Sequence, residues 1–345
     1  MNIALITDAW RPQVNGVVRT LSNTVRECEA LGHATTVIGP DRFRTVPCPS
    51  YPEIRLSVWA GNKVARLIER GEFDAVHIAT EGPLGLAARR CCRRLGRPFT
   101  TSCHTRFPEY LRCRLPVPIT ASYAWLRRFH NAAARTLVRS PSQKTDLERR
   151  GFNRLAIWPG GVDTELFRLY GKEALDYPRP VAMYMGRIAA EKNLEAFLEL
   201  DLPGSQVIVG DGPARAALQQ RYPRARFIGY RHGEALARIL AAADVFVFPS
   251  RTDTLGLVMI EALACGVPVA AFPVQGPQDV VINGVTGALD EDLESAVYSA
   301  LACDPVVCRE HAEAYSWRKS TARFLRLLEP ANLPVAETNA VLSAR

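Results

Sequence analysis

The sequence predicts a two-domain α/β protein with a parallel sheet in each domain. The 345 residues exceed what one hydrophobic core usually serves. Short apolar runs alternate with helical stretches in two successive series, which is the pattern of stacked βαβ units. A polar segment with two prolines, residues 168–180, separates the series. We therefore expect two Rossmann-like domains joined by a linker.

The first series predicts an N-terminal domain over residues 1–167. Its expected strands are residues 3–7, 35–38, 75–78, 98–102 and 137–140. A loop over residues 11–16 leads into a helix that Gly32 ends, and a second helix ends at Gly96, because glycine readily adopts the backbone conformation that closes a helix.

The second series predicts a C-terminal domain over residues 181–330. Its expected strands are residues 181–185, 206–209, 226–228, 245–248 and 267–271, with helices that begin near residues 194, 214, 234 and 257. An amphipathic stretch over residues 317–328 could pack on either domain. Residues 331–345 form a tail for which disorder is one expectation.

Composition excludes several classes of protein. The chain is 48% hydrophobic and 23% charged, which is typical of a globular protein and not of a disordered one. No apolar run reaches the roughly 20 residues of a membrane-spanning helix. The N-terminus lacks a basic lead and a cleavage site, so we expect a cytoplasmic protein that begins at Met1. The nine cysteines form no Cys-x-x-Cys pair, so we expect reduced thiols and no structural zinc site.

Basic residues concentrate in the first half of the chain. Residues 1–170 hold 26 Lys and Arg against 14 Asp and Glu, and residues 89–150 alone hold 15 against three. Such a surface attracts phosphates, whether of nucleic acid or of anionic lipid.

The most informative segment is residues 249–269. A buried strand leads into a polar turn with Asp253, and a helix begins near Gly256 and Leu257. Backbone amides at a helix start can bind a diphosphate, and Asp253 and Glu261 could bind sugar or ribose hydroxyls. The alternative is that Asp253 caps the helix and Glu261 is a solvated helix residue.

Two further segments follow expected strands of the second domain. Arg187 and Lys192 come after the strand 181–185, at the edge where α/β proteins bind ligands, and together could neutralise a pyrophosphate. Residues 210–213 contain two glycines that allow a tight turn near a ligand. An ordinary surface loop and a simple turn are the alternatives for these two segments.

These segments, in this order, resemble the retaining glycosyltransferases of family 4 over nearly the whole chain. The resemblance implies the GT-B fold, in which two Rossmann-like domains with parallel sheets face a central cleft. It implies that Glu261 holds the nucleotide ribose and that Arg187 and Lys192 hold the donor diphosphate. Asp253, near the donor sugar, stands where the family has Glu.

The resemblance extends to the first domain. Gly16 lies in a loop similar to the family's glycine-containing phosphate loop, although many relatives have two glycines there. Residues 103–110 match the family's histidine segment, which makes His104 a donor-sugar contact. We therefore take His104, Arg187, Lys192 and Asp253 as catalytic residues. Gly16, Gly256, Leu257 and Glu261 complete the donor site, together with Arg187 and Lys192.

The implied reaction is transfer of a hexose from a nucleotide diphosphate sugar to a hydroxyl, with retention at the anomeric carbon. GDP-mannose, UDP-glucose and UDP-glucuronate all remain candidate donors. No cofactor is required and a divalent cation is optional, because two cationic side chains and a helix terminus already meet the diphosphate. Alternatives are a soluble or polysaccharide acceptor, a GT-B nucleotide-sugar epimerase and a non-catalytic nucleic-acid binder; we expect no nucleic-acid partner.

The favoured acceptor is diacylglycerol or another membrane glycolipid precursor. Residues 119–139 place Trp125, Leu126 and Phe129 near helical spacing beside four arginines, so this helix could lie on an anionic membrane. The alternative is that its apolar stripe faces the domain core. We expect a peripheral enzyme on the inner face of the cell membrane.

Two other features have ordinary structural interpretations. The acidic triplet of residues 290–292 matches a metal-binding pattern of a different fold, but a helix N-cap is favoured. His77 could line the cleft, but a structural histidine with satisfied hydrogen bonds is favoured.

Overall fold

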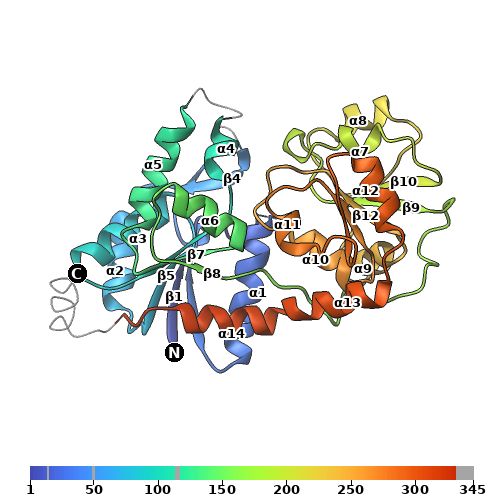
Figure 1. Ribbon diagram of the computed structural model, residues 1–345. Helices are drawn as coiled ribbons and strands as arrows, with labels where there is room; N and C mark the ends of the chain where they lie inside the picture. The colour runs from blue at the N-terminus through green and yellow to red at the C-terminus, as the bar shows by residue number, and fades with distance from the viewer. Residues whose placement is uncertain (14, 49–50, 113–116, 332–345) are drawn as a thin grey trace. The chain divides into compact units, whose positions relative to one another are not determined.

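The computed structural model describes residues 1–13, 15–48, 51–112 and 117–331 (Figure 1). The chain divides into two compact units. The first comprises Met1–Pro159 together with the segment from Ser320 onward, and the second comprises Gly160–Lys319. Both units are α/β, as the sequence predicts.

The division differs from the predicted boundaries in two respects. The second unit begins at Gly160, before the predicted linker, and the chain returns to the first unit from Ser320. Packing explains the return, because Phe324 and Leu328 are buried against the core around β1 and Ser320 Oγ donates to the Pro159 carbonyl at 2.6 Å. Of the predicted tail, residues 332–345 lie outside the described residues.

The first unit contains a parallel six-stranded sheet in the order β2-β1-β5-β6-β7-β8. The strands are β1 (Asn2–Ile6), β2 (Ala34–Ile38), β5 (Ala75–Ile78), β6 (Thr100–Cys103), β7 (Arg135–Val138) and β8 (Leu155–Ile157). A separate antiparallel pair consists of β3 (Thr45–Cys48) and β4 (Tyr51–Ser57).

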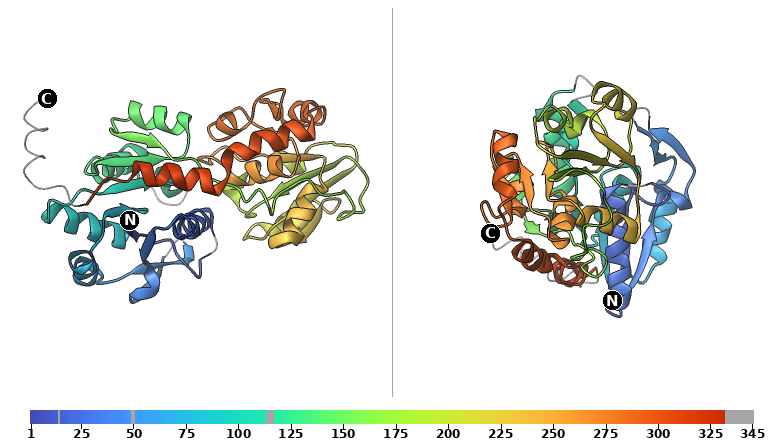
Figure 2. Two further views of the ribbon diagram at one scale, coloured as in Figure 1. Left: turned by 90° about the horizontal axis from the view of Figure 1, so that it is seen from below. Right: turned by 90° about the vertical axis from the view of Figure 1, so that its right-hand side faces the viewer.

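Helices cover both faces of this sheet (Figures 1 and 2). They are α1 (Gly16–Ala30), α2 (Gly61–Arg70), α3 (Pro83–Arg94), α4 (Phe107–Arg112), α5 (Ile119–His130), α6 (Pro141–Arg149) and α14 (Trp317–Leu327), whose first residues belong to the second unit. Side chains of α1 and α14 pack against one face of the sheet, and those of α2 and α3 pack against the other.

The second unit repeats this architecture with the strand order β11-β10-β9-β12-β13-β14. The strands are β9 (Val181–Met185), β10 (Ser205–Val209), β11 (Arg226–Gly229), β12 (Val245–Phe248), β13 (Val269–Ala271) and β14 (Gly287–Leu289). The α-helices are α7 (Glu195–Leu198), α8 (Arg215–Arg221), α9 (Gly233–Ala241), α10 (Leu257–Ala264), α11 (Pro277–Val280), α12 (Leu293–Ala300) and α13 (Pro305–Ala312). The strand order reverses beside β9, which is where open α/β sheets bind ligands.

Strand β6 is polar along its whole length and yet fully buried. Its hydroxyls bond to histidines, because a buried polar group without a partner is costly. His77 Nδ1 lies 2.9 Å from Thr100 Oγ1, and His77 Nε2 lies 3.0 Å from Ser102 Oγ. This confirms that His77 is a structural histidine with satisfied hydrogen bonds.

Burial of His77 makes stability depend on pH. Burial lowers the pKa of His77 from 6.5 to about 3, so the unfolded chain takes up a proton on this residue before the folded chain does. The contribution of His77 to stability is therefore present above pH 6.5 and is lost as the pH falls. We expect this contribution to drop by about 1 kcal/mol between pH 6.5 and 5.5. Urea unfolding at both pH values measures it.

The matched variants are His77→Gln and His232→Gln. The first should show a smaller loss of stability over this pH interval than the unmodified protein. The second removes an exposed histidine that is solvated in both states, so it should follow the unmodified protein. An unchanged pH dependence in His77→Gln would contradict the assignment.

Candidate functional site

Two loops of the second unit meet at the carboxyl edge of its sheet. They follow the neighbouring strands β9 and β12 and comprise residues 186–193 and 249–256; we call them the donor loops. Asn193 Nδ2 donates to the Pro249 carbonyl at 3.1 Å, and Thr252 Oγ1 donates to the Glu191 carbonyl at 3.3 Å. Lys192 Nζ lies 2.7 and 2.9 Å from the two carboxylate oxygens of Asp253. The structure thus brings together two predicted site residues that are far apart in sequence.

The loop after β10 packs closely under the first donor loop. Gly210 and Gly212 have positive φ, and a Cβ at these positions would lie 1.9 Å from the Gly186 carbonyl oxygen and 2.2 Å from that of Ile188. Ile188 N donates to the Asp211 carbonyl at 2.9 Å. Glycine is therefore required here by close approach to the backbone of the neighbouring loop, and this packing accounts for both glycines without a ligand.

Asp253 does not cap α10. The N-cap is Gly256, in the left-handed conformation with φ 75°, and Asp253 is paired with Lys192 instead. Both partners of this ion pair are mostly buried, with side-chain exposures of 18% and 19%. The capping alternative for Asp253 is therefore wrong.

Glu261 is buried in α10 with only 1% of its surface exposed. The pKa of the Cys265 thiol is raised to about 12, mainly because the thiol is buried, and the nearby negative charge of Glu261 adds to this effect. A solvated helix residue would not be buried in this way, so that alternative is wrong as well. Burying a carboxylate one turn inside a helix lowers the stability of the fold unless the carboxylate accepts hydrogen bonds.

The other predicted donor residues lie at the ends of elements. Arg187 is exposed in the first donor loop, and its carbonyl accepts a hydrogen bond from the buried hydroxyl of Tyr184 at 2.8 Å. Leu257 is the first residue of α10. In the first unit, Gly16 is the first residue of α1 and Asn15 is its N-cap. Asn15 Oδ1 accepts hydrogen bonds from the amides of Val17 and Val18 at 3.0 Å each. A Cβ at Gly16 would meet no atom within 4 Å, so the structure leaves space beside it.

His104 follows β6 in the first unit. Its Nε2 lies 2.8 Å from Ser102 Oγ, the same hydroxyl that bonds to His77. Burial, aided by the charge of Arg139, holds the pKa of His104 well below its ordinary value. His104 is therefore a neutral hydrogen-bonding group at neutral pH.

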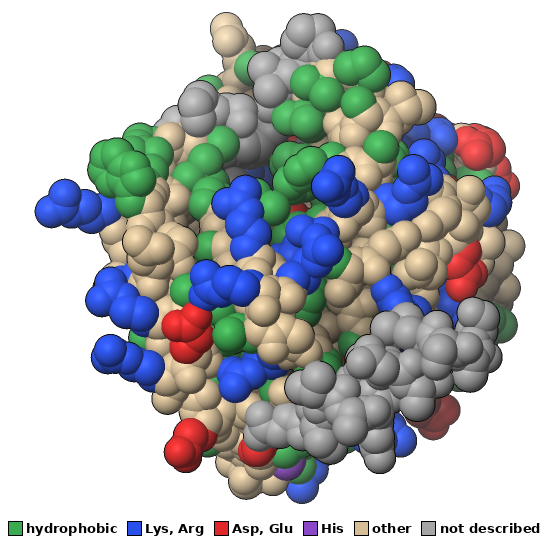
Figure 3. Space-filling view, turned by 90° about the vertical axis from the view of Figure 1, so that its left-hand side faces the viewer, with side chains coloured by type: hydrophobic (Ala, Val, Ile, Leu, Met, Phe, Trp, Pro, Cys, Tyr) green, Lys and Arg blue, Asp and Glu red, His purple; other side chains and the backbone are tan. Residues whose placement is uncertain are grey.

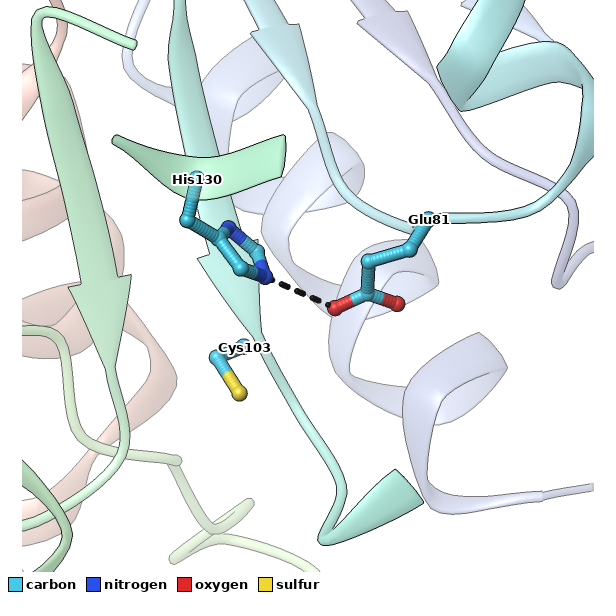
Figure 4. Close-up of side chains that lie close together, drawn as sticks. All are labelled: Glu81, Cys103 and His130. Atoms are coloured by element: carbon cyan, nitrogen blue, oxygen red, sulfur yellow. Dashed lines mark hydrogen bonds and ion pairs between the residues drawn. The ribbon is translucent and has the colours of Figure 1, made fainter. Parts of the chain in front are cut away.

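On the other face of β6, Glu81, Cys103 and His130 lie close together (Figure 4). Their potential ligand atoms lie within 4.8 Å of one another, which makes them the candidate metal-binding set among the described residues. His130 Nε2 is 3.1 Å from Glu81 Oε1, and His130 Nδ1 is 3.0 Å from Thr101 Oγ1. Burial and the nearby carboxylate raise the pKa of the Cys103 thiol, which disfavours the thiolate that a metal needs. The proximity of these three side chains is explained by a hydrogen-bonded pair of His130 and Glu81 that stabilises the fold.

The structure decides between the two interpretations of the amphipathic helix. Helix α5 ends at His130, and its apolar stripe faces the core, where Leu126 and Phe129 are 1% and 3% exposed. Trp125 stays exposed at 42%. The stripe therefore cannot lie on a membrane, which confirms the alternative interpretation for this stripe. Among the described residues, no helix is both long enough and apolar enough to span a bilayer.

The acidic triplet acts as expected. Asp292 is the N-cap of α12, where its side chain accepts hydrogen bonds from the amide of Glu294 and the hydroxyl of Ser295. Arg139 and Trp158 of the first unit have unusual environments. From the sequence, Arg139 was placed among the four arginines beside the apolar stripe of residues 119–139, and Trp158 was given no role. An arginine immediately after a buried strand was the available signal for the first of them.

The close packing under the donor loops makes a testable prediction. Gly210→Ala should lower the free energy of unfolding by about 3 kcal/mol or more, because its Cβ would overlap the Gly186 carbonyl. Gly284→Ala is the matched control, since Gly284 has φ +77° and open space around it. The control should cost only about 1–2 kcal/mol of backbone strain. Equal effects in urea unfolding would show that the loops do not pack as described.

Comparison with known proteins agrees with this geometry. Residues 14–166 match the model for Glycosyltransferase Family 4, and residues 179–303 match the model for Glycosyl transferases group 1. A GDP-mannose-dependent alpha-mannosyltransferase of Mycobacterium tuberculosis is 32% identical over 316 residues, covering 84% of this chain and 83% of the relative. An alpha-monoglucosyldiacylglycerol synthase of Streptococcus pneumoniae is 25% identical over 358 residues, covering 88% and 79%.

A solved structure shows the same fold. Sucrose-phosphate synthase from Thermosynechococcus elongatus superposes with a TM-score of 0.74 at 22% identity, covering 94% of this chain and 98% of the other. The strand order of the two sheets agrees with both family models. It also agrees with the mannosyltransferase match, which extends over most of the chain. The chain belongs to glycosyltransferase family 4 and is a glycosyltransferase with the GT-B fold.

Proposed function

We propose that this enzyme transfers a hexose from a nucleotide diphosphate sugar to a hydroxyl of a membrane lipid, with retention at the anomeric carbon. The observation that carries the proposal is the pair of donor loops, which places Lys192 and Asp253 together at the ligand edge of the second sheet. The name of the mycobacterial relative supports GDP-mannose as the first donor to test, with UDP-sugars next.

The charges at the donor loops suit departure of a nucleoside diphosphate. When the bond to the sugar breaks, negative charge grows on the leaving phosphate. Lys192, Arg187 and the amides at Gly256 and Leu257 would stabilise that charge, because preorganised donors are most effective where charge develops. Asp253 would repel a phosphate, so its carboxylate is better suited to the hydroxyls of the sugar. Glu261 would accept hydrogen bonds from the ribose hydroxyls.

The neutral state of His104 fits a contact with an uncharged sugar hydroxyl. Its lowered pKa keeps the ring uncharged at neutral pH, so it can donate or accept one hydrogen bond without adding charge. In this proposal the acceptor attacks the same face that the diphosphate leaves. The leaving phosphate takes the acceptor's proton, so no side-chain base is needed.

The lipid acceptor is supported by a relative and by a basic surface. The pneumococcal relative is named as a diacylglycerol glucosylating enzyme. Arg90, Arg93, Arg127 and Arg128 are exposed on α3 and α5, and Arg89 joins these helices through the carbonyls of Arg128 and Phe129 at 2.7 and 3.1 Å. Figure 3 looks onto this side of the first unit and shows several basic side chains with few acidic ones between them. Such a surface would attract anionic lipid headgroups.

Substitutions at the donor loops test the site. Lys192→Met should lower kcat by about 10²- to 10³-fold, because one preorganised cation is lost from the leaving group. Release of nucleoside diphosphate from GDP-mannose, UDP-glucose and UDP-glucuronate, with vesicles containing diacylglycerol, measures it. Lys144→Met is the matched control, since Lys144 forms a surface ion pair with Glu148 on α6. Turnover that survives in Lys192→Met as it does in Lys144→Met would refute this assignment.

Vesicle binding tests the basic surface. Replacing Arg127 and Arg128 together with Gln should weaken binding to vesicles rich in anionic lipid, by about 1 kcal/mol for each charge near the surface. Replacing Arg221 and Arg224 of the second unit changes the net charge equally and serves as the control, with binding expected to stay within twofold. Co-sedimentation at low and physiological salt measures both. Loss of binding in the control alone would place the membrane contact elsewhere.

A further inference from the structure

Three side chains gather at the carboxyl edge of the first sheet. His104, Arg139 and Trp158 each follow directly after one of the neighbouring strands β6, β7 and β8. The Trp158 ring centroid lies 5.6 Å from the His104 ring centroid and 5.1 Å from Arg139 Cζ. The indole therefore has an imidazole and a guanidinium against it, at the edge where α/β sheets bind ligands.

Arg139 carries an uncompensated buried charge. It is 3% exposed, and its Nη1 has no hydrogen-bond partner among the described residues. Among the described residues, Arg139 forms no ion pair with an Asp or Glu. Burial lowers its pKa to about 10, so the guanidinium stays protonated at neutral pH. The Trp158 ring offers this cation a cation–π contact, but no described carboxylate neutralises it. A buried charge without a carboxylate partner lowers stability, which favours a role in binding a ligand over a role in folding alone.

Among the described residues, the surroundings of Arg139 add further hydrogen-bond donors. Trp158 Nε1 is also buried and without a partner among the described residues. The positive end of α6 begins next to Arg139, with Ser140 as its N-cap. Gln143 fixes the backbone, because its Oε1 accepts from Arg139 N at 2.6 Å and its Nε2 donates to the Cys103 carbonyl at 3.3 Å. The unpartnered indole N–H and the positive end of α6 both favour a negatively charged hydrogen-bond acceptor.

We propose that Arg139, with Trp158 beside it, binds an anionic group of a substrate, a carboxylate, sulfonate or phosphate other than the donor diphosphate. The inference rests on the proposed function, in which His104 contacts the donor sugar and the diphosphate lies at the donor loops. The group belongs either to an acidic donor sugar or to an acidic acceptor headgroup. In both cases Arg139 selects the charged substrate over its neutral counterpart.

Paired substrates separate the two sources. UDP-glucuronate and UDP-glucose differ only at C6. Glucuronosyldiacylglycerol and glucosyldiacylglycerol likewise differ only at C6 of the sugar, and both keep free sugar hydroxyls that can accept the transferred hexose. Steady-state kinetics with each combination gives the preference of the enzyme for the charged member of each pair. Arg139→Gln should reduce that preference by about 10- to 100-fold in one pair, and Arg139→Lys should restore part of it.

The matched control is Arg135→Gln, at the start of the same strand. Arg135 Nη1 donates to the Leu327 carbonyl at 2.8 Å, so this arginine already has a partner. The control should leave both preferences unchanged. A reduction confined to the donor pair assigns the group to the sugar, and one confined to the acceptor pair assigns it to the headgroup. No change in either preference, or an equal loss of activity with every substrate, would overturn the proposal.

A second measurement is independent of turnover. Without substrate, Arg139→Met should raise Tm by about 2–4 °C, because it removes a buried charge that no described carboxylate neutralises. Arg135→Met should lower Tm, since it removes a bonded group. UDP-glucuronate or glucuronosyldiacylglycerol should raise the Tm of the unmodified protein more than its neutral counterpart does, and this difference should vanish in Arg139→Met.

These shifts keep the two hypotheses distinguishable. If no combination of substrates yields product but the Tm differences appear, the anion site stands and the proposed function fails. If product forms, the proposed function stands. If, in addition, Arg139→Met is less stable than the unmodified protein and both proteins bind the charged probes equally well, only the proposed anion site is refuted.

Discussion

The ion pair between Lys192 and Asp253 joins the loops that follow two neighbouring strands of the second sheet. Beneath the first of these loops, Gly210 and Gly212 let the loop after β10 approach the backbone of Gly186 and Ile188 closely. A mostly buried ion pair is costly to desolvate and adds little stability by itself. In the proposed function, this ion pair would fix a cation and a carboxylate side by side before a ligand binds, so that little reorganisation is needed during the reaction.

The same principle governs the first unit, with histidines in place of an ion pair. A buried strand made of Thr, Ser and Cys would be unfavourable without partners, and His77 and His130 supply them on opposite faces of β6. Ser102 then connects His77 to His104, so the structural histidine also fixes the orientation of the predicted sugar contact. Stability and site geometry therefore depend on the same hydroxyl.

Much of the fold could be predicted because parallel strands are short, apolar and separated by helices. Strands β5, β9 and β12 were predicted at their observed bounds. The pair β3 and β4 and the edge strands β8 and β14 were missed, because short edge strands lack the continuous apolar pattern of buried ones. The orientation of the amphipathic stripe of residues 119–139 could not be predicted, because such a stripe looks the same whether it faces lipid or a core.

The site was predicted unevenly for a physical reason. Residues that follow a strand could be placed at the ligand edge from the sequence, and this located Lys192 and Asp253. Their ion pair could not be foreseen, nor could the isolation of Arg139, because both depend on which side chains from other strands lie nearby.

Mass spectrometry of lipids tests the account most directly. The purified protein is incubated with vesicles of diacylglycerol and anionic lipid and with GDP-mannose, UDP-glucose or UDP-glucuronate in separate reactions. The account predicts a lipid heavier by one sugar in at least one reaction, with an equal amount of nucleoside diphosphate released. Nucleoside diphosphate without a lipid product would contradict the acceptor, and neither product in any reaction would contradict the proposed function itself.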